Sequence, residues 1–268
     1  MRVLKLASCM AENGEPFCQN ITAYIQSRLG IKTAYVNDIP WQERERLFDE
    51  GQIQILWLCG LPYVHKADLR ESDMELLAVP VPADPRYQGR AIYFSDVIVR
   101  TESPFKTFAE LRRKVWAYNE PRSHSGYNVV RAYLSSLVDG SGFFAKAVES
   151  GAHTASLAMV MEGCVDCAAI DSTVLEWFLS KHHDLRQRIR MIESFGPSPI
   201  PPWVISRRVP ESDRERLRKL LLKMDEDPMG GPILSAGRMA RFVAASDTDY
   251  DPIRSMARAA EQITLEVL

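Results

Sequence analysis

The sequence predicts an α/β protein built as two lobes. The first sixty residues alternate in the order β-α-β-α-β, which is typical of a parallel sheet with helices on its faces. A second alternating block follows at roughly 98–198, and a mainly helical tail comes after it. If the tail packs back on the first block, lobe 1 is residues 1–97 plus 200–268 and lobe 2 is residues 98–199, with a cleft between the lobes.

Hydrophobic spacing and chain breakers predict the elements of the first block. Apolar residues recur at helical spacing from Phe17 to Leu29, and Gly30 is a plausible stop for that helix. Pro40 stands where the next helix begins. The predicted helices are Glu15–Leu29 and Trp41–Glu50, and the predicted strands are Arg2–Ala7, Lys32–Val36, Ile53–Leu58, Leu76–Val81 and Ala91–Val99.

The same patterns predict the second block and the tail. The predicted strands are Val115–Tyr118, Val165–Ile170, Ile189–Glu193 and Trp203–Ser206. The predicted helices are Thr107–Lys114, Ser125–Leu137, Phe143–Glu149, Thr154–Glu162, Ser172–His182, Ser212–Asp225 and Pro252–Val267. Two chain crossings between the lobes, near Ser95–Val99 and Phe195–Val204, are expected to serve as hinges.

The composition excludes several classes of protein. With 268 residues and 46% hydrophobic content, the chain can form one large domain or two lobes. A formal net charge of -2 does not indicate a nucleic-acid partner, so any anion recognition must come from a local site. The sequence contains no run of about eighteen apolar residues, so no direct membrane insertion is expected. The first residues read as a strand, so the chain is expected in the cytoplasm as it stands and in the periplasm if a leader was removed.

The cysteines and the charged helix do not indicate a reactive centre. Five cysteines cannot form a complete disulfide framework, and the pair Cys164 and Cys167 lacks two further soft ligands for a metal ion. We expect buried structural thiols there, no metal site and no cofactor. A solvated helix face is predicted for the interleaved charges Glu43, Arg44, Glu45, Arg46, Asp49 and Glu50.

The most informative segment follows the strand that ends at Tyr118. Ser123, His124, Ser125 and Gly126 stand where the next helix should begin. The first turn of a helix has N–H groups without internal partners, and its dipole favours an anion. Two hydroxyls and a glycine that permits close approach would complete an anion site. The alternative is that Ser123 or Ser125 only caps the helix.

Four further residues are candidates for the same site. His153 precedes a predicted helix and can donate to an anion, although a lone histidine is more often structural. Asp171 ends an apolar strand, where ligands bind in open α/β sheets. It could accept a proton from a monoprotonated oxyanion, pair with a ligand amine, or only cap the helix that begins at Ser172. Tyr63 and Tyr93 offer rigid apolar area with one hydroxyl each, or belong to the core.

Motifs of several enzyme classes are absent. The sequence contains no G-x-x-x-x-G-K-[ST], no H-E-x-x-H and no G-x-S-x-G, and no G-x-G-x-x-G follows the first strand. Ser123 and His124 are adjacent at a helix start and point in different directions, so a catalytic triad with Asp171 is not expected. We therefore predict a protein that is not an enzyme.

Several segments resemble the phosphate-, phosphite- and phosphonate-binding components of ABC importers. The resemblance covers most of residues 50–205 and implies the type 2 periplasmic binding protein fold. The matching segments are Tyr93-Phe-Ser-Asp-Val-Ile-Val-Arg100, Phe108-Ala-Glu-Leu-Arg112, Ser123-His-Ser-Gly126, Gly151-Ala-His153 with Ser156-Leu157, and Asp166-Cys-Ala-Ala-Ile-Asp171.

The resemblance also implies a site and a function. The helix start from Ser123 to Gly126 would hold the phosphonate oxygens, Tyr63 and Tyr93 of the first lobe would lie across the ligand, and His153 and Asp171 would complete the site. The middle residue of the S-x-S-G segment is often threonine in the family, and His124 in this place could add positive charge below its pKa or reshape the pocket for another ligand. We expect a solute-binding protein for a small anionic ligand, with an ABC permease as partner. A cytoplasmic ligand sensor and an enzyme on the same fold are the alternatives.

Overall fold

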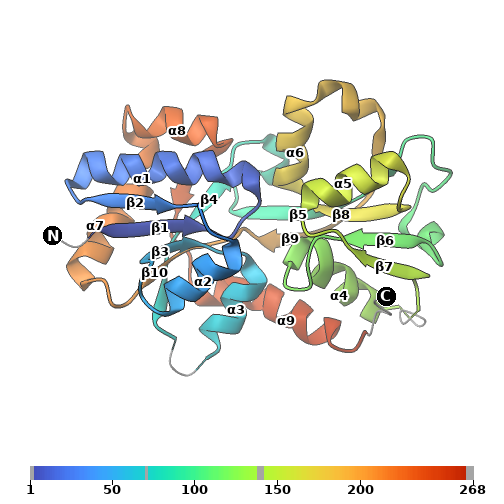
Figure 1. The fold of residues 1–268 in the computed structure, drawn as a ribbon, viewed down its shortest axis with the longest axis horizontal. Helices are drawn as coiled ribbons and strands as arrows, with labels where there is room; N and C mark the ends of the chain where they lie inside the picture. The colour runs from blue at the N-terminus through green and yellow to red at the C-terminus, as the bar shows by residue number, and fades with distance from the viewer. Residues whose placement is uncertain (1–2, 70–71, 138–141, 264–268) are drawn as a thin grey trace. The chain divides into compact units, whose positions relative to one another are not determined.

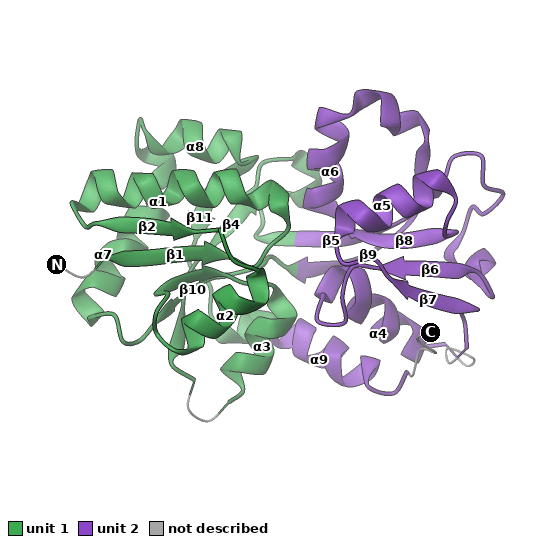
Figure 2. Cartoon of the chain, viewed as in Figure 1, with its two compact units in different colours: residues 1–92, 199–250 green, residues 93–198, 251–268 purple. Residues whose placement is uncertain are grey.

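The chain divides into two compact units, each with its own sheet and core. The computed structural model describes residues 3–69, 72–137 and 142–263. Unit 1 consists of Met1–Ile92 and Pro199–Tyr250, and unit 2 consists of Tyr93–Ser198 and Asp251–Leu268 (Figure 1, Figure 2).

Unit 1 is built on a mixed sheet. Among the described residues this sheet has six strands in the order β11-β4-β10-β3-β1-β2. Strands β1, β2 and β3 are parallel, whereas β10 runs antiparallel to β3 and β4, and β11 runs antiparallel to β4. The strands are β1 (Leu4–Ser8), β2 (Thr33–Val36), β3 (Ile55–Trp57), β4 (Met74–Pro82), β10 (Trp203–Ser206) and β11 (Met239–Val243).

Helices cover the unit 1 sheet and bury an aromatic core. Helix α1 (Glu15–Leu29) ends where Gly30 takes a left-handed conformation, with φ of 65°, and donates its N–H to Gln26 O. The Phe17 ring on this helix meets Trp57 edge-on at 5.8 Å, and Trp57 stacks on Trp203 at 5.6 Å between ring centroids. The other helices are α2 (Trp41–Asp49), α3 (Gly60–Ala67), α7 (Glu211–Leu222) and α8 (Gly230–Ala236).

Unit 2 has a second mixed sheet. Its described part has five strands in the order β7-β6-β8-β5-β9. Strand β6 pairs in parallel with β7 and β8, and β5 pairs antiparallel with β8. The elements are β5 (Ile92–Arg100), β6 (Val115–Tyr118), β7 (Lys146–Glu149), β8 (Cys167–Asp171), β9 (Ile189–Pro199), α4 (Val129–Ser135), α5 (His153–Glu162), α6 (Ser172–Lys181) and α9 (Asp251–Ala260).

The two units differ from the predicted lobes at two places. Strand β5 was expected to close the first lobe, but nearly all of it lies in unit 2 because its backbone pairs with β8, from Ser95 opposite Asp171 onward. Helix α9 was expected in the first lobe and lies instead in unit 2, where it packs on α4. The Arg131 side chain also donates to Ile263 O there, at 2.7 Å. The chain therefore passes between the units three times rather than twice, and the predicted helix Pro252–Val267 extends beyond the described residues.

Short elements account for most of the differences from the sequence prediction. Phe143–Glu149 was predicted to be helical and contains strand β7, because Lys146–Glu149 pairs with β6 at the sheet edge. Thr107–Lys114 contains only a 3-10 turn, at Phe108–Leu111. Helices α3 and α8 and strand β11 had no predicted counterpart.

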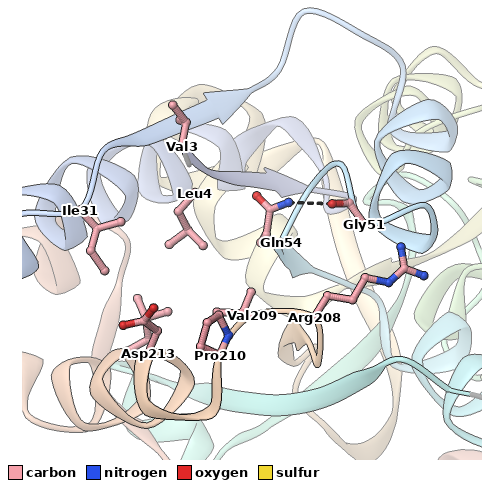
Figure 3. A pocket seen from close by; sticks show the side chains of 10 residues that line it. Val3, Leu4, Ile31, Gly51, Gln54, Arg208, Val209, Pro210 and Asp213 are labelled. Carbon is pink, nitrogen blue, oxygen red and sulfur yellow. Dashed lines mark hydrogen bonds between the residues drawn. The ribbon is translucent and has the colours of Figure 1, made fainter. Parts of the chain in front are cut away.

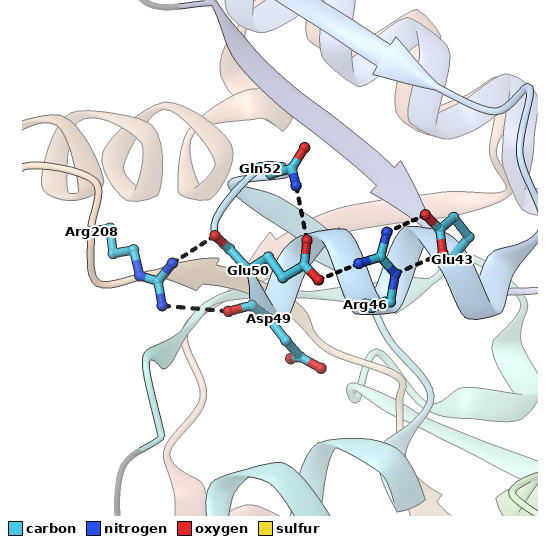
Figure 4. A network of polar contacts seen from close by, with 6 residues as sticks. All are labelled: Glu43, Arg46, Asp49, Glu50, Gln52 and Arg208. Carbon is cyan, nitrogen blue, oxygen red and sulfur yellow. Dashed lines mark hydrogen bonds and ion pairs between the residues drawn. The ribbon is translucent and has the colours of Figure 1, made fainter.

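The charged helix α2 is only partly a solvated face. Arg46 pairs with Glu43 and with Glu50 on the exposed side, as predicted (Figure 4). Arg44 is 7% exposed and Glu45 is 4% exposed, so the prediction is wrong for both. The Arg44 guanidinium donates to the carbonyl oxygens of Ser8, Ile39 and Asn37 and pairs with Glu15. It thereby joins the ends of β1 and β2 to two helices.

Candidate functional site

The predicted anion site lies in unit 2, where the chain leaves β6 and enters the next helix. Ser123 is the residue before the helix, and its Oγ accepts the Gly126 N–H at 3.0 Å. The first turn, His124–Asn128, has the wider π geometry and leads directly into α4. The N–H groups of His124 and Ser125 donate no hydrogen bond to any residue in the described part of the chain. Ser123 is thus a cap, as the alternative stated, and the binding of an anion by these two amides stays a prediction.

Ser125 and His153 form the hydrogen-bonded centre of this site. Ser125 Oγ lies 3.1 Å from His153 Nε2, and the Ser95 hydroxyl of β5 donates to Ser125 O. His153 is the first residue of α5 and is 7% exposed. Burial lowers the pKa of His153 to about 4, so its imidazole is neutral near pH 7.

His124 does not supply the positive charge that a protonated imidazole would add to the site. Its Nδ1 lies 3.2 Å from Asn128 Nδ2, and its Nε2 lies 3.0 Å from Ser198 Oγ. Because the Asn128 amide donates, Nδ1 accepts, and Nε2 carries the hydrogen that is donated to Ser198. Burial lowers the pKa of His124 to about 3, so the expected positive charge does not form near neutral pH. The ring instead ties the helix start to the end of β9.

Asp171 caps helix α6, as the alternative interpretation stated. Its Oδ1 accepts from the Thr173 N–H at 2.8 Å and from the Thr173 hydroxyl at 2.6 Å. Burial raises the pKa of Asp171 to about 6, although the bonds from Thr173 oppose this shift. In the sheet Asp171 lies opposite Ser95, whose hydroxyl contacts Ser125, so the carboxyl group belongs to the same region of unit 2. Its contact with a ligand stays a prediction.

Gly126 is required by close packing, which involves an asparagine that the sequence did not single out. A Cβ atom at position 126 would lie 1.9 Å from Asn119 Oδ1 and 3.1 Å from His153 Cε1. Asn119 follows the last residue of β6, where the rule for ligand sites in α/β sheets could have directed attention. Ser95 and Ser198, which contact the site from β5 and β9, were also missed.

The two tyrosines lie in different units. Tyr93 was expected in the first lobe, but it is the first residue of unit 2. It is 1% exposed, and its ring centroid lies 6.4 Å from that of His124. Tyr63 lies in α3 of unit 1, where its ring packs 4.5 Å from that of Tyr250. Its hydroxyl donates to Asp247 at 2.7 Å. Tyr63 therefore has the core contacts of the alternative, and its role at a ligand stays a prediction.

A separate cavity in unit 1 contains none of the predicted site residues. It has a volume of about 100 Å³ and lies at the amino ends of β1 and β3, beside α7 (Figure 3). Leu4, Ile31 and Val209 form part of its apolar wall, and Arg208 and Asp213 are its charged residues.

The described residues contain neither a metal cluster nor a membrane span. Within residues 3–69, 72–137 and 142–263, no three His, Cys, Asp or Glu side chains are grouped to hold a metal ion. No helix in these ranges is both long enough and apolar enough to cross a bilayer. The C-x-x-C pair is split: Cys167 is buried, but Cys164 is exposed, so the prediction of two buried thiols is wrong for Cys164.

Comparison with known proteins identifies the family. The family described as the periplasmic phosphonate substrate-binding protein of ABC transporters matches residues 12–250. The phosphonates-binding periplasmic protein of Escherichia coli is 24% identical over 212 residues. That alignment covers 77% of this chain and 61% of the relative, so the chain spans less than two thirds of the relative's length.

Solved structures show the same fold. The methylphosphonate complex of PhnD1 from Prochlorococcus marinus has a TM-score of 0.83 at 19% identity, covering 97% of this chain and 99% of the other. A binding component of an ABC phosphonate transporter from Pseudomonas aeruginosa has a TM-score of 0.82 at 17% identity, covering 97% and 87%. The fold is thus that of the two-lobed type 2 periplasmic binding proteins, as predicted. With most of its length matched, the chain belongs to the family of phosphonate substrate-binding proteins of ABC transporters.

Proposed function

We propose that this chain captures a small phosphonate- or phosphate-like oxyanion in the periplasm and delivers it unchanged to an ABC permease. The observation that carries the proposal is the helix start in unit 2. There the amides of His124 and Ser125 have no acceptor in the described part of the chain, and the Ser125 hydroxyl lies beside them. This choice of ligand class is supported by the family of the chain and by the methylphosphonate complex of the similar protein PhnD1.

Hydroxyl and amide donors can hold a buried oxyanion. A charged oxygen can be removed from water only if it is hydrogen-bonded in the site. Charge-assisted bonds from neutral donors are shorter and about twice as strong as bonds between neutral groups. His153 orients the Ser125 hydroxyl, and Ser95 fixes the backbone of the same residue. These contacts hold the donors in place before the ligand arrives, which reduces the entropy lost on binding.

A thermal-shift panel with one variant tests the binding. Phosphate, phosphite, methylphosphonate and small carboxylates are added in turn, and a ligand at one hundred times its Kd should stabilise the fold by about 2.7 kcal/mol. Ser125→Ala should weaken the responding ligand by about 1.5–3 kcal/mol, since one hydrogen bond to a charged group is lost. The control is Ser136→Ala, because Ser136 lies exposed at the other end of α4. Equal affinity in Ser125→Ala and wild type would remove the proposed site.

A second measurement separates binding from catalysis. The protein is incubated with excess ligand, and phosphorus NMR follows the ligand over many hours. A binding protein leaves the spectrum unchanged while calorimetry reports saturable binding. A new resonance that grows with protein concentration would support the alternative of an enzyme on this fold.

A further inference from the structure

Two side chains from different elements converge on Gly126. Asn119 Oδ1 lies 1.9 Å and His153 Cε1 lies 3.1 Å from the position that a Cβ atom would take at this residue. Asn119 is held at the end of β6, where its carbonyl accepts the Gly151 N–H. His153 begins α5 and is 7% exposed. The glycine, which has no side chain, lets both groups reach the same point.

Each of these side chains has a buried polar atom without a hydrogen-bond partner in the described part of the chain. The two atoms are Asn119 Oδ1 and His153 Nδ1. Folded proteins pair nearly all of their buried polar atoms, so each exception requires an explanation. One unpaired atom on each of two side chains that converge on the same glycine indicates a group that a ligand supplies.

Both atoms are acceptors. An amide oxygen can only accept, and a neutral imidazole has one N–H and one lone pair. An N–H on His153 Nδ1 would be a buried donor without an acceptor, which is rarer in proteins than an unpaired acceptor. The hydrogen therefore lies on Nε2 and is donated to Ser125 Oγ, 3.1 Å away. The hydroxyl hydrogen of Ser125 then remains available for a ligand oxygen.

A fully ionised oxyanion can satisfy neither acceptor, because all its oxygens are acceptors too, whereas the one P–OH group of a monoprotonated oxyanion can satisfy one of them. The hydrogen-bond partners described for Ser123, His124, Ser125 and His153 also include no lysine or arginine. Without a cationic side chain among these partners, a second negative charge on the ligand would be costly to bury.

We infer that the site selects a monoprotonated oxyanion whose P–OH group donates to Asn119 Oδ1 or His153 Nδ1. The ionised oxygens of the ligand accept from the amides of His124 and Ser125 and from the Ser125 hydroxyl. This inference rests on the proposed function and adds Asn119 to the residues that touch the ligand.

The protein also titrates, so the test must separate its protons from those of the ligand. Burial raises the pKa of Asp171 to about 6, and its ionisation brings a negative charge into the same unit. The titratable and charged groups on the surrounding elements include Tyr93, Asp96 and Arg100 on β5, Tyr118, Glu120 and Arg122 at and after the end of β6, His124 and Tyr127 at the helix start, Arg131 and Tyr133 on α4, Lys146 and Glu149 on β7, His153 and Glu162 on α5, and Cys167 and Asp171 on β8.

Methylphosphonate and methanesulfonate make a matched pair of probes. They have the same shape, but methanesulfonate is a monoanion without an O–H group and does not titrate near neutral pH. Calorimetric Kd values are measured for both at several pH values on either side of the second ionisation of methylphosphonate. Any pH dependence of methanesulfonate binding reports protein groups such as Asp171, and the difference between the two curves reports the ligand proton.

The expected result is a fall in methylphosphonate affinity of about tenfold per pH unit above its second ionisation, after correction by the methanesulfonate curve. Below that ionisation, methanesulfonate should bind at least about tenfold more weakly, since it leaves both acceptors unpaired. Asn119→Ala should weaken methylphosphonate about tenfold and reduce its advantage over methanesulfonate. Asn20→Ala, at an exposed position of α1, should change neither value.

Two results overturn the inference while the proposed function stands: a methylphosphonate affinity that is flat or rises through the second ionisation, or equal binding of the two probes. Both comparisons use the wild-type protein, so they hold even if Asn119→Ala does not fold. If methylphosphonate, phosphite and phosphate all fail to bind, the proposed function fails and the inference fails with it.

Discussion

Replacing Gly126 with alanine tests the packing of the site directly. The added Cβ would lie 1.9 Å from Asn119 Oδ1 and 3.1 Å from His153 Cε1, and both side chains are short and fixed by their elements. Overpacking of this kind costs about 1–3 kcal/mol. Gly126 does not have a positive φ, so alanine also gains about 0.5–1 kcal/mol of helix preference. The net expectation is a loss of about 0–2.5 kcal/mol, against a gain of about 0.5–1 kcal/mol for an alanine without the overpacking.

Thermal unfolding with a matched glycine measures this effect. Each kcal/mol lowers the Tm by about 2–4 °C for a chain of this size. Gly231→Ala in α8 is the control, because no atom lies within 4 Å of its Cβ position and the variant should be at least as stable as wild type. Adding Asn119→Ala to Gly126→Ala should restore part of the loss, and the double-mutant cycle gives the coupling. A Gly126→Ala protein that melts no lower than Gly231→Ala would refute the reasoning.

Two further predictions concern stability. Arg44→Ala should lower the free energy of unfolding, measured by urea titration, by about 3 kcal/mol, because three carbonyl oxygens and a carboxylate lose their buried partner. The control is Arg46→Ala, which should cost under about 1 kcal/mol because the ion pairs of Arg46 are exposed. Equal losses in the two variants would contradict the burial argument. Burial holds the pKa of His124 at about 3 and that of His153 at about 4, below the usual 6.5, so the unfolded chain binds more protons and stability should fall as the pH drops from about 6.5 toward 3. The raised pKa of Asp171, about 6, acts in the opposite direction: it makes the protein more stable as the pH falls from 6 to 3.8. Because the two histidines cause the loss of stability, a variant with both His124→Gln and His153→Gln should lose less stability between pH 7 and 4 than wild type does. An equal loss would exclude the two histidines as the cause.

Local signals predicted the elements whose pattern or flanking residues mark both ends. The bounds of α1 follow from its apolar spacing and from Gly30, whose left-handed conformation ends the helix. The predicted bounds of strand β6, Val115–Tyr118, are also those observed. Phe143–Glu149 shows the limit of this approach, because Phe143, Phe144 and Ala147 have helical spacing while pairing with β6 makes the last four residues a strand. Tertiary pairing decides the structure of such short segments.

The position of the candidate site could be predicted, but not the partner of each side chain. Serines and a glycine after a strand indicate a helix start from sequence alone. The contact between His124 and Ser198 joins residues that are 74 positions apart, so no local pattern shows that the imidazole is buried and neutral. The place of Asn119 directly after β6 was a signal in the sequence, but its contact with Gly126 was not visible there, since that contact depends on how β6 and the helix pack.

The placement of α9 affects the order in which the two units can be completed during folding. Unit 1 needs residues up to Tyr250, and unit 2 needs the helix that follows, so neither unit is one continuous stretch of chain. A fragment of residues 93–198 would lack the helix that packs on α4. In chain order, unit 1 is therefore complete at Tyr250, whereas unit 2 is complete only when the final helix is present, although most of its residues come before the last strand of unit 1. The helix start that carries the candidate site reaches its final packing only when α9 has joined α4.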